Sequence, residues 1–327
     1  MPFSPYERKK PVIGVIVNPY SRRNLKTKCA AVEQFASIGN GKADVRATSS
    51  LEELDRILME FKEKNYLYIG ISGGDGTIHN VITRLIHIYR PDPIPAILLL
   101  NDGTMNNIAI SIGLKGDSTQ ILSSFFSMVD NTFTPRMVTR DTMKVGDRYC
   151  FLFGFGMVSN FLNECYSDGK KGFRKNIMAI GKTVSETIGD VLNNLTLKKE
   201  SELSVMKSMN LSVKVDSQQV GFRNVLFVLA GTVEQVGMGF KTLYRANDMP
   251  GKFHCLINGM RPIDIVTQLS RFAAGVRIEN SLNIDETISL LEVEADSPFE
   301  FTMDGDMYVS DGSLEVENGI PVRFILV

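Results

Sequence analysis

Several patterns that mark common binding sites are missing from this chain. Its 327 residues include only three histidines and four cysteines, no CxxC pair occurs, and no histidine stands at ligand spacing from another histidine or cysteine. Neither a zinc site nor a disulfide framework is therefore indicated. Basic and acidic residues nearly balance, with a formal net charge of -1. No general affinity for nucleic acid follows from that balance.

Long apolar runs and the usual phosphate motifs are missing as well. No stretch of about 18 apolar residues occurs, so we expect no transmembrane helix. The apolar part of the N-terminal segment breaks at Asn18-Pro19, which predicts a first strand rather than a signal peptide. With scattered, reduced thiols, this predicts a cytoplasmic protein. The patterns GxxxxGK[ST] and GxGxxG after a strand are both absent, so a phosphate site must be of another type.

The first part of the chain alternates between strand and helix patterns. Apolar or β-branched runs predict strands over 11–17, 43–47, 66–71 and 96–100, and helical periodicity predicts helices over 26–38, 51–61, 78–86 and 106–112. Ser50 with Glu53 predicts a capping box at the second of these helices. The alternation predicts parallel βαβ units, which bind ligands at the carboxyl ends of their strands.

The second part of the chain has a different pattern. Runs typical of antiparallel strands cover 147–155, 211–215, 224–230, 252–256, 289–294 and 300–303, and only 160–195 is mainly helical. We predict an α/β N-terminal domain with a parallel sheet, and a C-terminal domain that is a β-rich antiparallel sandwich. The predicted domains are 8–138 and 139–315, the second with a helical insertion at 160–195. We expect the last strand, 316–327, to return to the first domain.

A glycine-rich turn, SGGDGT at residues 72–77, connects a buried strand to an amphipathic helix. Glycines at such a turn let backbone N–H groups face an anion, and the helix N-terminus adds positive potential. Asp75 would repel phosphate, but it fits the site if it reaches Mg²⁺. The alternative is a tight turn in which Asp75 caps the helix.

A second acidic motif, Asp304-Gly305-Asp306, lies near the C-terminus. In a strand, residues two apart point to one face, so the two carboxylates are predicted to project together. Such a pair suits phosphoryl transfer, in which one acid accepts the proton of an attacking hydroxyl. The alternative is an acidic turn exposed to solvent.

Three motifs together resemble the diacylglycerol kinase catalytic family. GGDGT after a strand is followed by a second glycine turn, GTMNNIA at 103–109, and the early segment Asn18-Pro19-Tyr20-Ser21 is similar to the family's first nucleotide-contacting turn. The resemblance extends to a β-rich C-terminal domain, as in bacterial soluble lipid kinases.

The resemblance implies ATP and Mg²⁺ as cofactors and assigns roles to individual residues. Asp304 takes the place of the proposed proton acceptor, and Asp306 stands where glutamate is usual, with Asp75 as the third catalytic acid. Mg²⁺ is expected at Asp75 and Asp141. The residues expected to contact the nucleotide are Asn18, Ser21, Thr48, Gly73, Gly74, Gly76, Thr77, Gly103, Thr104, Asn106 and Asn107.

The chain departs from the family pattern at two further positions. Asn107 stands where many bacterial relatives have an aspartate, although sphingoid and ceramide kinases also lack that acid. Some relatives hold a structural Mg²⁺ in a loop that resembles residues 245–252. The usual acid there is replaced by Pro250, so this second metal is not predicted.

The resulting hypothesis is a cytoplasmic lipid kinase that acts at a membrane surface and phosphorylates a primary hydroxyl, as on diacylglycerol. A sphingoid-base or ceramide kinase, an NAD or sugar kinase with the same GGDG core, and a non-catalytic relative that binds nucleotide or lipid remain alternatives. The expected partner is the lipid, not nucleic acid. An edge strand of the β-rich domain could also pair with a second copy, giving a homodimer.

Overall fold

The computed structural model describes residues 12–21, 24–25, 30–103, 106–131, 133–167, 206–237 and 240–327, without the side chains of 164–167 and 266. The chain divides into two compact units. Unit 1 comprises Met1–Arg140 and Pro321–Val327, and unit 2 comprises Asp141–Ile320. The chain thus leaves unit 1 once and returns at Pro321. No described helix is long and apolar enough to cross a membrane.

Unit 1 is built on one mostly parallel sheet. The order of its strands is β2-β1-β3-β4-β19-β5, and only β5 runs antiparallel to its neighbour. Strands β1, β3 and β4 are almost entirely buried and apolar, as expected for parallel strands covered on both faces. The strands are β1 (Ile13–Val17), β2 (Ala43–Ala47), β3 (Tyr68–Gly73), β4 (Ala96–Asn101), β5 (Arg136–Arg140) and β19 (Val322–Leu326).

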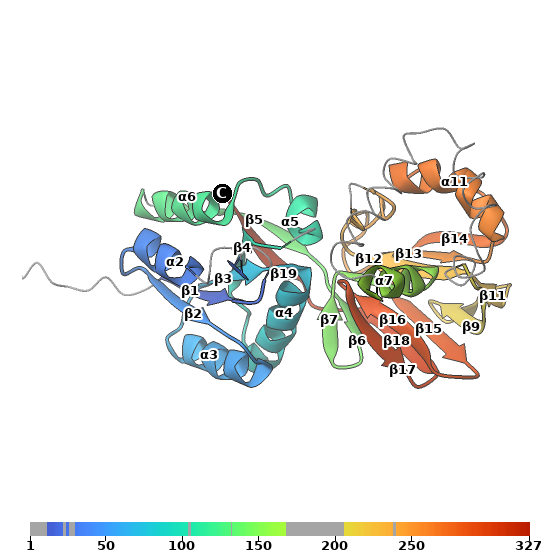
Figure 1. The fold of residues 1–327 in the computed structure, drawn as a ribbon, viewed down its shortest axis with the longest axis horizontal. Coiled ribbons are helices and arrows are strands. Elements are labelled where there is room, and N and C mark those ends of the chain that lie inside the picture. Colours follow the sequence, from blue (N-terminus) through green and yellow to red (C-terminus); the bar gives the residue numbers. More distant parts are fainter. Residues whose placement is uncertain are drawn as a thin grey trace, which may run out of the picture. The chain divides into compact units, whose positions relative to one another are not determined.

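Helices cover both faces of this sheet. Helices α2 and α6 pack against each other on one face, and α3 and α4 pack on the other (Figure 1). Ser50 caps α3 as predicted, but the Glu53 carboxylate accepts from the Ser49 backbone and hydroxyl instead of completing the capping box. The helices are α2 (Ala31–Gly39), α3 (Leu51–Glu63), α4 (Asp75–Tyr89), α5 (Asn107–Ser111) and α6 (Ser118–Asp130).

Unit 2 consists of two antiparallel sheets and two helices within the described residues. One sheet has the order β10-β9-β15-β18-β6-β7 with β11 beside β9, and the other has β14-β13-β12-β8-β16-β17. The elements are β6 (Met143–Val145), β7 (Arg148–Cys150), β8 (Leu152–Gly156), α7 (Met157–Ser167), β9 (Met209–Val215), β10 (Gln218–Gln219), β11 (Asn224–Val225), β12 (Phe227–Gly231), β13 (Phe253–Asn258), α11 (Pro262–Ala274), β14 (Asn283–Ile288), β15 (Leu290–Ala295), β16 (Phe299–Met303), β17 (Asp306–Ser310) and β18 (Ser313–Asn318).

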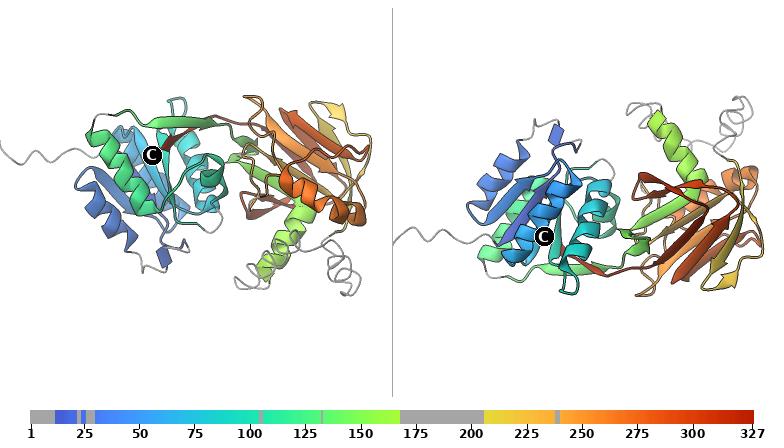
Figure 2. Two further views of the ribbon diagram at one scale, coloured as in Figure 1. Left: turned by 90° about the horizontal axis from the view of Figure 1, so that it is seen from above. Right: turned by 90° about the horizontal axis from the view of Figure 1, so that it is seen from below.

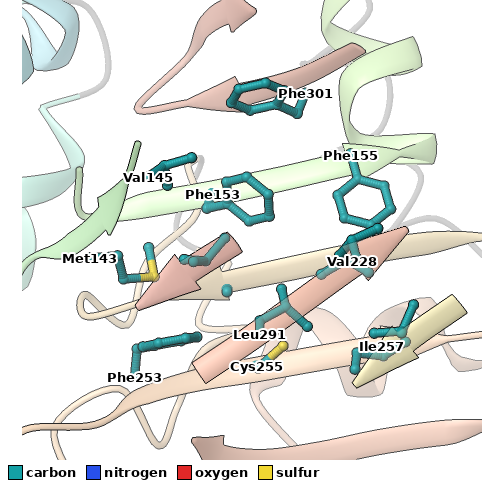
Figure 3. Packing of buried hydrophobic residues seen from close by; sticks show 14 of the residues in the cluster. Met143, Val145, Phe153, Phe155, Val228, Phe253, Cys255, Ile257, Leu291 and Phe301 are labelled. Atoms are coloured by element: carbon teal, nitrogen blue, oxygen red, sulfur yellow. The ribbon is translucent and has the colours of Figure 1, made fainter. Parts of the chain in front are cut away.

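The two sheets of unit 2 pack face to face around one apolar core. Alternate residues of both sheets supply it, among them Phe153 and Phe253 from one sheet and Met143 and Leu291 from the other (Figure 3). This is the predicted antiparallel sandwich, in which the inner faces of two sheets interdigitate. The parallel α/β unit and the β-rich unit together confirm the predicted fold class.

A second apolar cluster covers the outer face of the sheet that contains β8, β12 and β13. It joins Leu229 and Leu256 to Ile265 and Phe272 of α11, while α7 starts beside β8, β12 and β16 and extends away from this sheet (Figure 2). Helix α11 was not predicted, although Pro262 opens it and Gly275 ends it in a left-handed conformation. Most of the predicted insertion at 160–195 lies outside the described residues.

Candidate functional site

Three neighbouring strands of unit 1 end at the same edge of the sheet. Strand β3 lies between β1 and β4, with Val17 opposite Ser72 and Gly73 opposite Asn101. The turns that follow these strands, which begin at Asn18, Gly74 and Asp102, are therefore adjacent. The structure thus brings together three segments that are far apart in the sequence, at the strand ends where open α/β sheets bind ligands.

The GGDGT motif forms the start of helix α4. Gly74 is the N-cap in an extended conformation, and Asp75 is the first helical residue. One carboxylate oxygen of Asp75 accepts a hydrogen bond of 3.1 Å from the backbone N–H of Asn107, at the start of α5. Asp75 therefore joins the first glycine turn to the second, which goes beyond the helix-capping role that the sequence left open.

The two glycine turns touch each other through their backbones. A Cβ atom added to Gly103 would lie 2.5 Å from Cα of Gly74, so only glycine fits at this position without displacing the backbone. Asn106 adopts the left-handed conformation, and its side-chain oxygen accepts from the Gly103 N–H at 3.1 Å. Thr104, also expected at the site, lies outside the described residues.

The turn that begins at Asn18 is attached to helix α4 by a side-chain contact. The amide group of Asn18 donates to the Thr77 hydroxyl at 2.8 Å and accepts from the Tyr20 N–H at 2.9 Å. Ser21 is buried beside this turn. Thr48 lies at the end of β2, where its hydroxyl donates to the Ser50 carbonyl at 2.9 Å, and this bond fits the structural role of a strand-end hydroxyl.

Three polar residues that sequence reasoning missed lie beneath these turns. The Ser72 hydroxyl donates to the Asp102 carboxylate at 2.6 Å and accepts from the Asn24 amide at 3.1 Å. Ser72 and Asp102 each precede a glycine of a predicted turn, so a polar residue at the end of an apolar strand was an available signal. Asn24 gave no such signal, because only the fold brings it to the strand ends.

The residues at this edge can hold an anionic ligand such as a phosphate chain. The Ser21 hydroxyl oxygen and the Asn107 side-chain oxygen are buried and have no hydrogen-bond partner within the described part of the chain. No group of three or more histidine, cysteine, aspartate or glutamate residues that could hold a metal occurs there either. Mg²⁺ bound by one or two carboxylates together with phosphate oxygens suits such a site.

In unit 2, the Asp304-Gly305-Asp306 motif is a hairpin turn rather than a strand segment. Strand β16 ends at Met303 and β17 begins at Asp306, and these two residues pair. Asp304 and Gly305 both have positive φ, 49° and 93°. Asp-Gly is a preferred pair for two-residue hairpin turns with positive φ at both positions. The prediction that both carboxylates project from one face of a strand is therefore wrong.

The two acids of this turn differ in their surroundings. Asp304 is buried, and its carboxylate accepts hydrogen bonds of 2.8–3.1 Å from the backbone N–H groups of Phe151 and Leu152. Burial and the Asp304 charge raise the pKa of the adjacent Cys150 thiol. Asp304 thus ties the turn to β8, and this contact is internal to the sheet.

Asp306 is exposed at the start of β17. The residue two positions on, Tyr308, has the Arg148 guanidinium 4.8 Å from its ring centroid. Burial and the Asp306 charge raise the pKa of the Tyr308 hydroxyl. Asp306 is therefore exposed near Tyr308, whereas the Asp304 side chain is buried.

The loop at 245–252 has a cationic side chain among its acids. Arg245 contacts the carboxylates of Asp248 at 3.2 Å and Glu286 at 3.4 Å, and donates to the Asp285 carbonyl at 3.1 Å. Asp141, an expected metal ligand, accepts from the Gly251 N–H at 2.7 Å. Asp141 thus holds this loop, and the Arg245 guanidinium lies between two of the nearby carboxylates.

Comparison with known proteins agrees with the fold and the motifs. Residues 12–133 match the family model of the diacylglycerol kinase catalytic domain. The fold is similar to a diacylglycerol kinase from Bacillus anthracis str. Sterne, at 13% identity, with 98% of each chain covered and a TM-score of 0.63. Two candidate diacylglycerol kinases from the same strain share 14% and 16% identity, with 98% of each chain covered and a TM-score of 0.66. No curated protein matches the chain.

These likenesses have different weight. At 13–16% identity the solved structures establish the fold alone. The family match is a match of sequence, and it covers both glycine turns and the turn that begins at Asn18. The match of residues 12–133 therefore supports the diacylglycerol kinase catalytic-domain family that their motifs predicted.

Proposed function

We propose that this protein is an ATP- and magnesium-dependent lipid kinase that phosphorylates a primary hydroxyl, as on diacylglycerol. One observation carries the proposal: the backbone contact between Gly74 and Gly103, which Asp75 reinforces by its bond to Asn107. Two glycine turns in contact, with a carboxylate between them, can hold a phosphate chain and a metal ion. The family match of residues 12–133 supports a kinase, and the lipid acceptor is our proposal.

The residues of unit 1 would bind and orient the nucleotide. Backbone N–H groups at Gly74 and Gly76, with the N-terminus of α4, would hold the phosphates. The Thr77 hydroxyl is already oriented by Asn18. Ser21 and Asn107 offer buried polar atoms without a partner in the described residues, and a ligand that bonds to them would remove an unfavourable feature of the unliganded protein.

Asp75 would hold Mg²⁺ together with phosphate oxygens of the nucleotide. When bound, Mg·ATP supplies the phosphoryl group, and the metal ion neutralises charge on the transferred group. The protein's part is to fix the reacting groups in position and to provide matching charge.

In unit 2, we propose that Asp306 accepts the proton of the lipid hydroxyl and that Asp304 positions the turn. The sequence favoured Asp304 as the acceptor. However, its buried carboxylate already accepts bonds from two backbone N–H groups, and these bonds occupy part of its four lone-pair sites. Asp306 is two residues away and exposed, and we assign the proton-accepting role to it.

The test is transfer of label from γ-labelled ATP with Mg²⁺ to a panel of acceptors. Diacylglycerol, monoacylglycerol, ceramide, sphingosine and phosphatidylglycerol are presented in mixed micelles, and NAD and fructose 6-phosphate in solution. We expect label in one lipid, with none for the Asp75→Ala variant. Label only in NAD or the sugar would overturn the lipid acceptor. Binding of ATP without transfer to any acceptor would favour a non-catalytic relative.

A further inference from the structure

A network of buried hydrogen bonds beneath the glycine turns has no part in the mechanism above. The Asn24 amide donates to the Asn18 carbonyl at 2.8 Å and to the Ser72 hydroxyl at 3.1 Å, and the Ser72 hydroxyl donates to the Asp102 carboxylate at 2.6 Å. Asn24, Ser72 and Asp102 are each at most 2% exposed. This hydrogen-bond network therefore joins the ends of β1, β3 and β4 inside unit 1.

Each strand-end residue in this network lies next to a turn of the candidate site. Ser72 precedes Gly73, Asn18 begins the first turn, and Asp102 precedes Gly103. The Asp102 N–H also bonds to the Leu100 carbonyl at 2.7 Å, so the backbone bends sharply at Asp102. Asp102 thus fixes the direction in which the chain enters Gly103, the residue that must approach the Gly74 backbone.

A carboxylate is an unfavourable choice for a position that serves packing alone. Removing it from water costs several kcal/mol unless hydrogen bonds compensate, and an alanine or leucine would fill a buried strand end at lower cost. A short hydroxyl-to-carboxylate bond is about twice as strong as a neutral one, and its direction is well defined. These properties suit a residue that must hold its neighbour in one orientation.

We propose that Asp102 is a positioning residue for the nucleotide. Through Ser72 and Asn24 it holds the second glycine turn against the first, and so sets the affinity of unit 1 for Mg·ATP. The inference rests on the proposed function in one respect, namely that the ligand of these turns is ATP. A phosphate cradle acts on ground state and transition state alike, so its loss raises KM with little change in kcat.

The experiment measures Mg·ATP binding by titration calorimetry, and KM and kcat on the acceptor that the panel identifies. Asp102→Asn keeps the size of the side chain and removes its charge, and Ser72→Ala removes the intermediate hydroxyl. We expect each variant to raise Kd and KM for Mg·ATP about tenfold or more with kcat within about threefold, which corresponds to about 1.4 kcal/mol of lost binding. The double variant should bind Mg·ATP no more weakly than the weaker-binding single variant, because both residues act in one hydrogen-bond network.

Asp44→Asn is the matched control, because it makes the same change in the same unit at the other end of the sheet. Asp44 lies near the start of β2 and is paired with Arg46 and Lys64. Removing its charge should lower the thermal midpoint without changing Kd for Mg·ATP. A purely structural Asp102 would behave like Asp44, with a lower midpoint and unchanged Kd and KM, and that result would overturn the proposal.

The remaining outcomes separate this proposal from the lipid kinase proposal. Mg·ATP that binds, and binds more weakly to Asp102→Asn, supports Asp102 even when no lipid is labelled. Lipid labelling with equal Mg·ATP binding by wild type and both variants overturns Asp102 alone. A wild-type protein that does not bind Mg·ATP overturns both. If Asp102→Asn does not fold, Ser72→Ala decides, since it removes one hydroxyl and leaves the carboxylate.

Discussion

Asp304 and Asp306 are separated by one glycine, yet different properties depend on them. Asp304→Asn should lower the free energy of unfolding by about 1–3 kcal/mol, because the Phe151 and Leu152 N–H groups lose a charged acceptor. Asp306→Asn should leave stability unchanged and lower kcat about 100-fold or more, the usual loss when a general base is removed. Urea unfolding and initial rates of lipid labelling measure the two effects.

The contrary result would reverse the two roles. An Asp304→Asn variant with wild-type stability and no turnover, beside an active Asp306→Asn variant, would show that Asp304 accepts the proton after all. Glu300→Gln is a suitable control, since Glu300 lies on β16 and is exposed, and a glutamine oxygen can still accept the bond from the Asn163 amide. That change should affect neither quantity.

A buried histidine–aspartate pair in unit 2 makes stability depend on pH. His254 lies 2.8 Å from the Asp285 carboxylate, which also accepts from the Tyr244 hydroxyl at 3.1 Å. Burial alone would raise the pKa of Asp285. The bonds from His254 and Tyr244, with the charges of His254 and Arg277, outweigh burial and lower the pKa below 3.8. The carboxylate therefore stabilises the folded state above pH 3.8, and this contribution is lost as pH falls through the lower, folded-state pKa.

Asp285→Asn tests this dependence. At pH 7 the change should lower the free energy of unfolding by about 3 kcal/mol, because it breaks a buried pair. Below pH 3.8 the difference between variant and wild type should shrink, since the wild-type carboxylate is then protonated first in the unfolded state and, at lower pH, in the folded state. Urea unfolding at several pH values measures it. A difference that stays constant from pH 7 to pH 3 would mean that the charge of Asp285 does not stabilise unit 2.

At the scale of elements, the contact between the two glycine turns predicts the effect of one added methyl group. Gly103→Ala places a Cβ atom 2.5 Å from Cα of Gly74, so one turn must move. We expect Mg·ATP binding to weaken about tenfold or more while the protein remains folded, because a displaced cradle loses its aligned N–H groups. Titration calorimetry measures binding, and circular dichroism confirms the fold.

Gly221→Ala is the matched control for that change. An added Cβ at Gly221 meets nothing within 4 Å, and its φ is not positive. This variant should bind Mg·ATP like wild type and be as stable or slightly more so, because alanine restricts the unfolded chain. Equal Mg·ATP binding by both variants would mean that the close contact of the turns is not needed for the nucleotide.

Local patterns predicted most elements of unit 1, because β1, β3 and β4 are continuous apolar runs and the helices have one apolar face. Helix α4 follows this rule, with Ile78, Val81, Ile82 and Leu85 all buried. Residues 304 and 305 were predicted to continue a strand, but they form a turn. The residues before it, Phe301 to Met303, do form a strand, but the Asp-Gly pair prefers a turn more strongly than the preceding strand favours continuation.

The candidate site was predicted where a motif is local and missed where contacts are distant. GGDGT and GTMNN are contiguous, so their glycines identified two turns. Asn24 reaches Ser72, 48 residues away, and Ser72 reaches Asp102, 30 residues away. No periodicity links such positions, and only the parallel order β1-β3-β4 brings them together. Asp304 was predicted as an acid of the site, but its backbone contacts to residues near 151 depend on the pairing of β16 with β8.

At the scale of the whole molecule, the C-terminal segment makes unit 1 depend on the completion of unit 2. Strand β19 lies between β4 and β5 in the sheet of unit 1. Its residues Val322, Phe324 and Ile325 are fully buried. The chain must therefore pass through all of unit 2 before the sheet of unit 1 is complete. Unit 2, in contrast, is a continuous segment, Asp141–Ile320.

A chain that ends at residue 320 tests this dependence. Burial of each of the three apolar side chains contributes about 1.5–3 kcal/mol, so the deletion removes about 6 kcal/mol, comparable with the whole stability of a typical domain. It also leaves β4 and β5 without the strand between them. We expect unit 1 to lose cooperative unfolding while unit 2 keeps it. Hydrogen exchange should show lost protection at β1, β3 and β4 and retained protection at β12 and β13.

Deletion of Val327 alone is the control, because this residue follows β19 and pairs with no strand. That variant should exchange like the full chain. Retained protection at β1, β3 and β4 in the chain ending at 320 would show that the four strands β2, β1, β3 and β4 fold without their C-terminal neighbour. Loss of protection in both units would instead mean that unit 2 is stable only when unit 1 is folded, since its own residues are all present in the shortened chain.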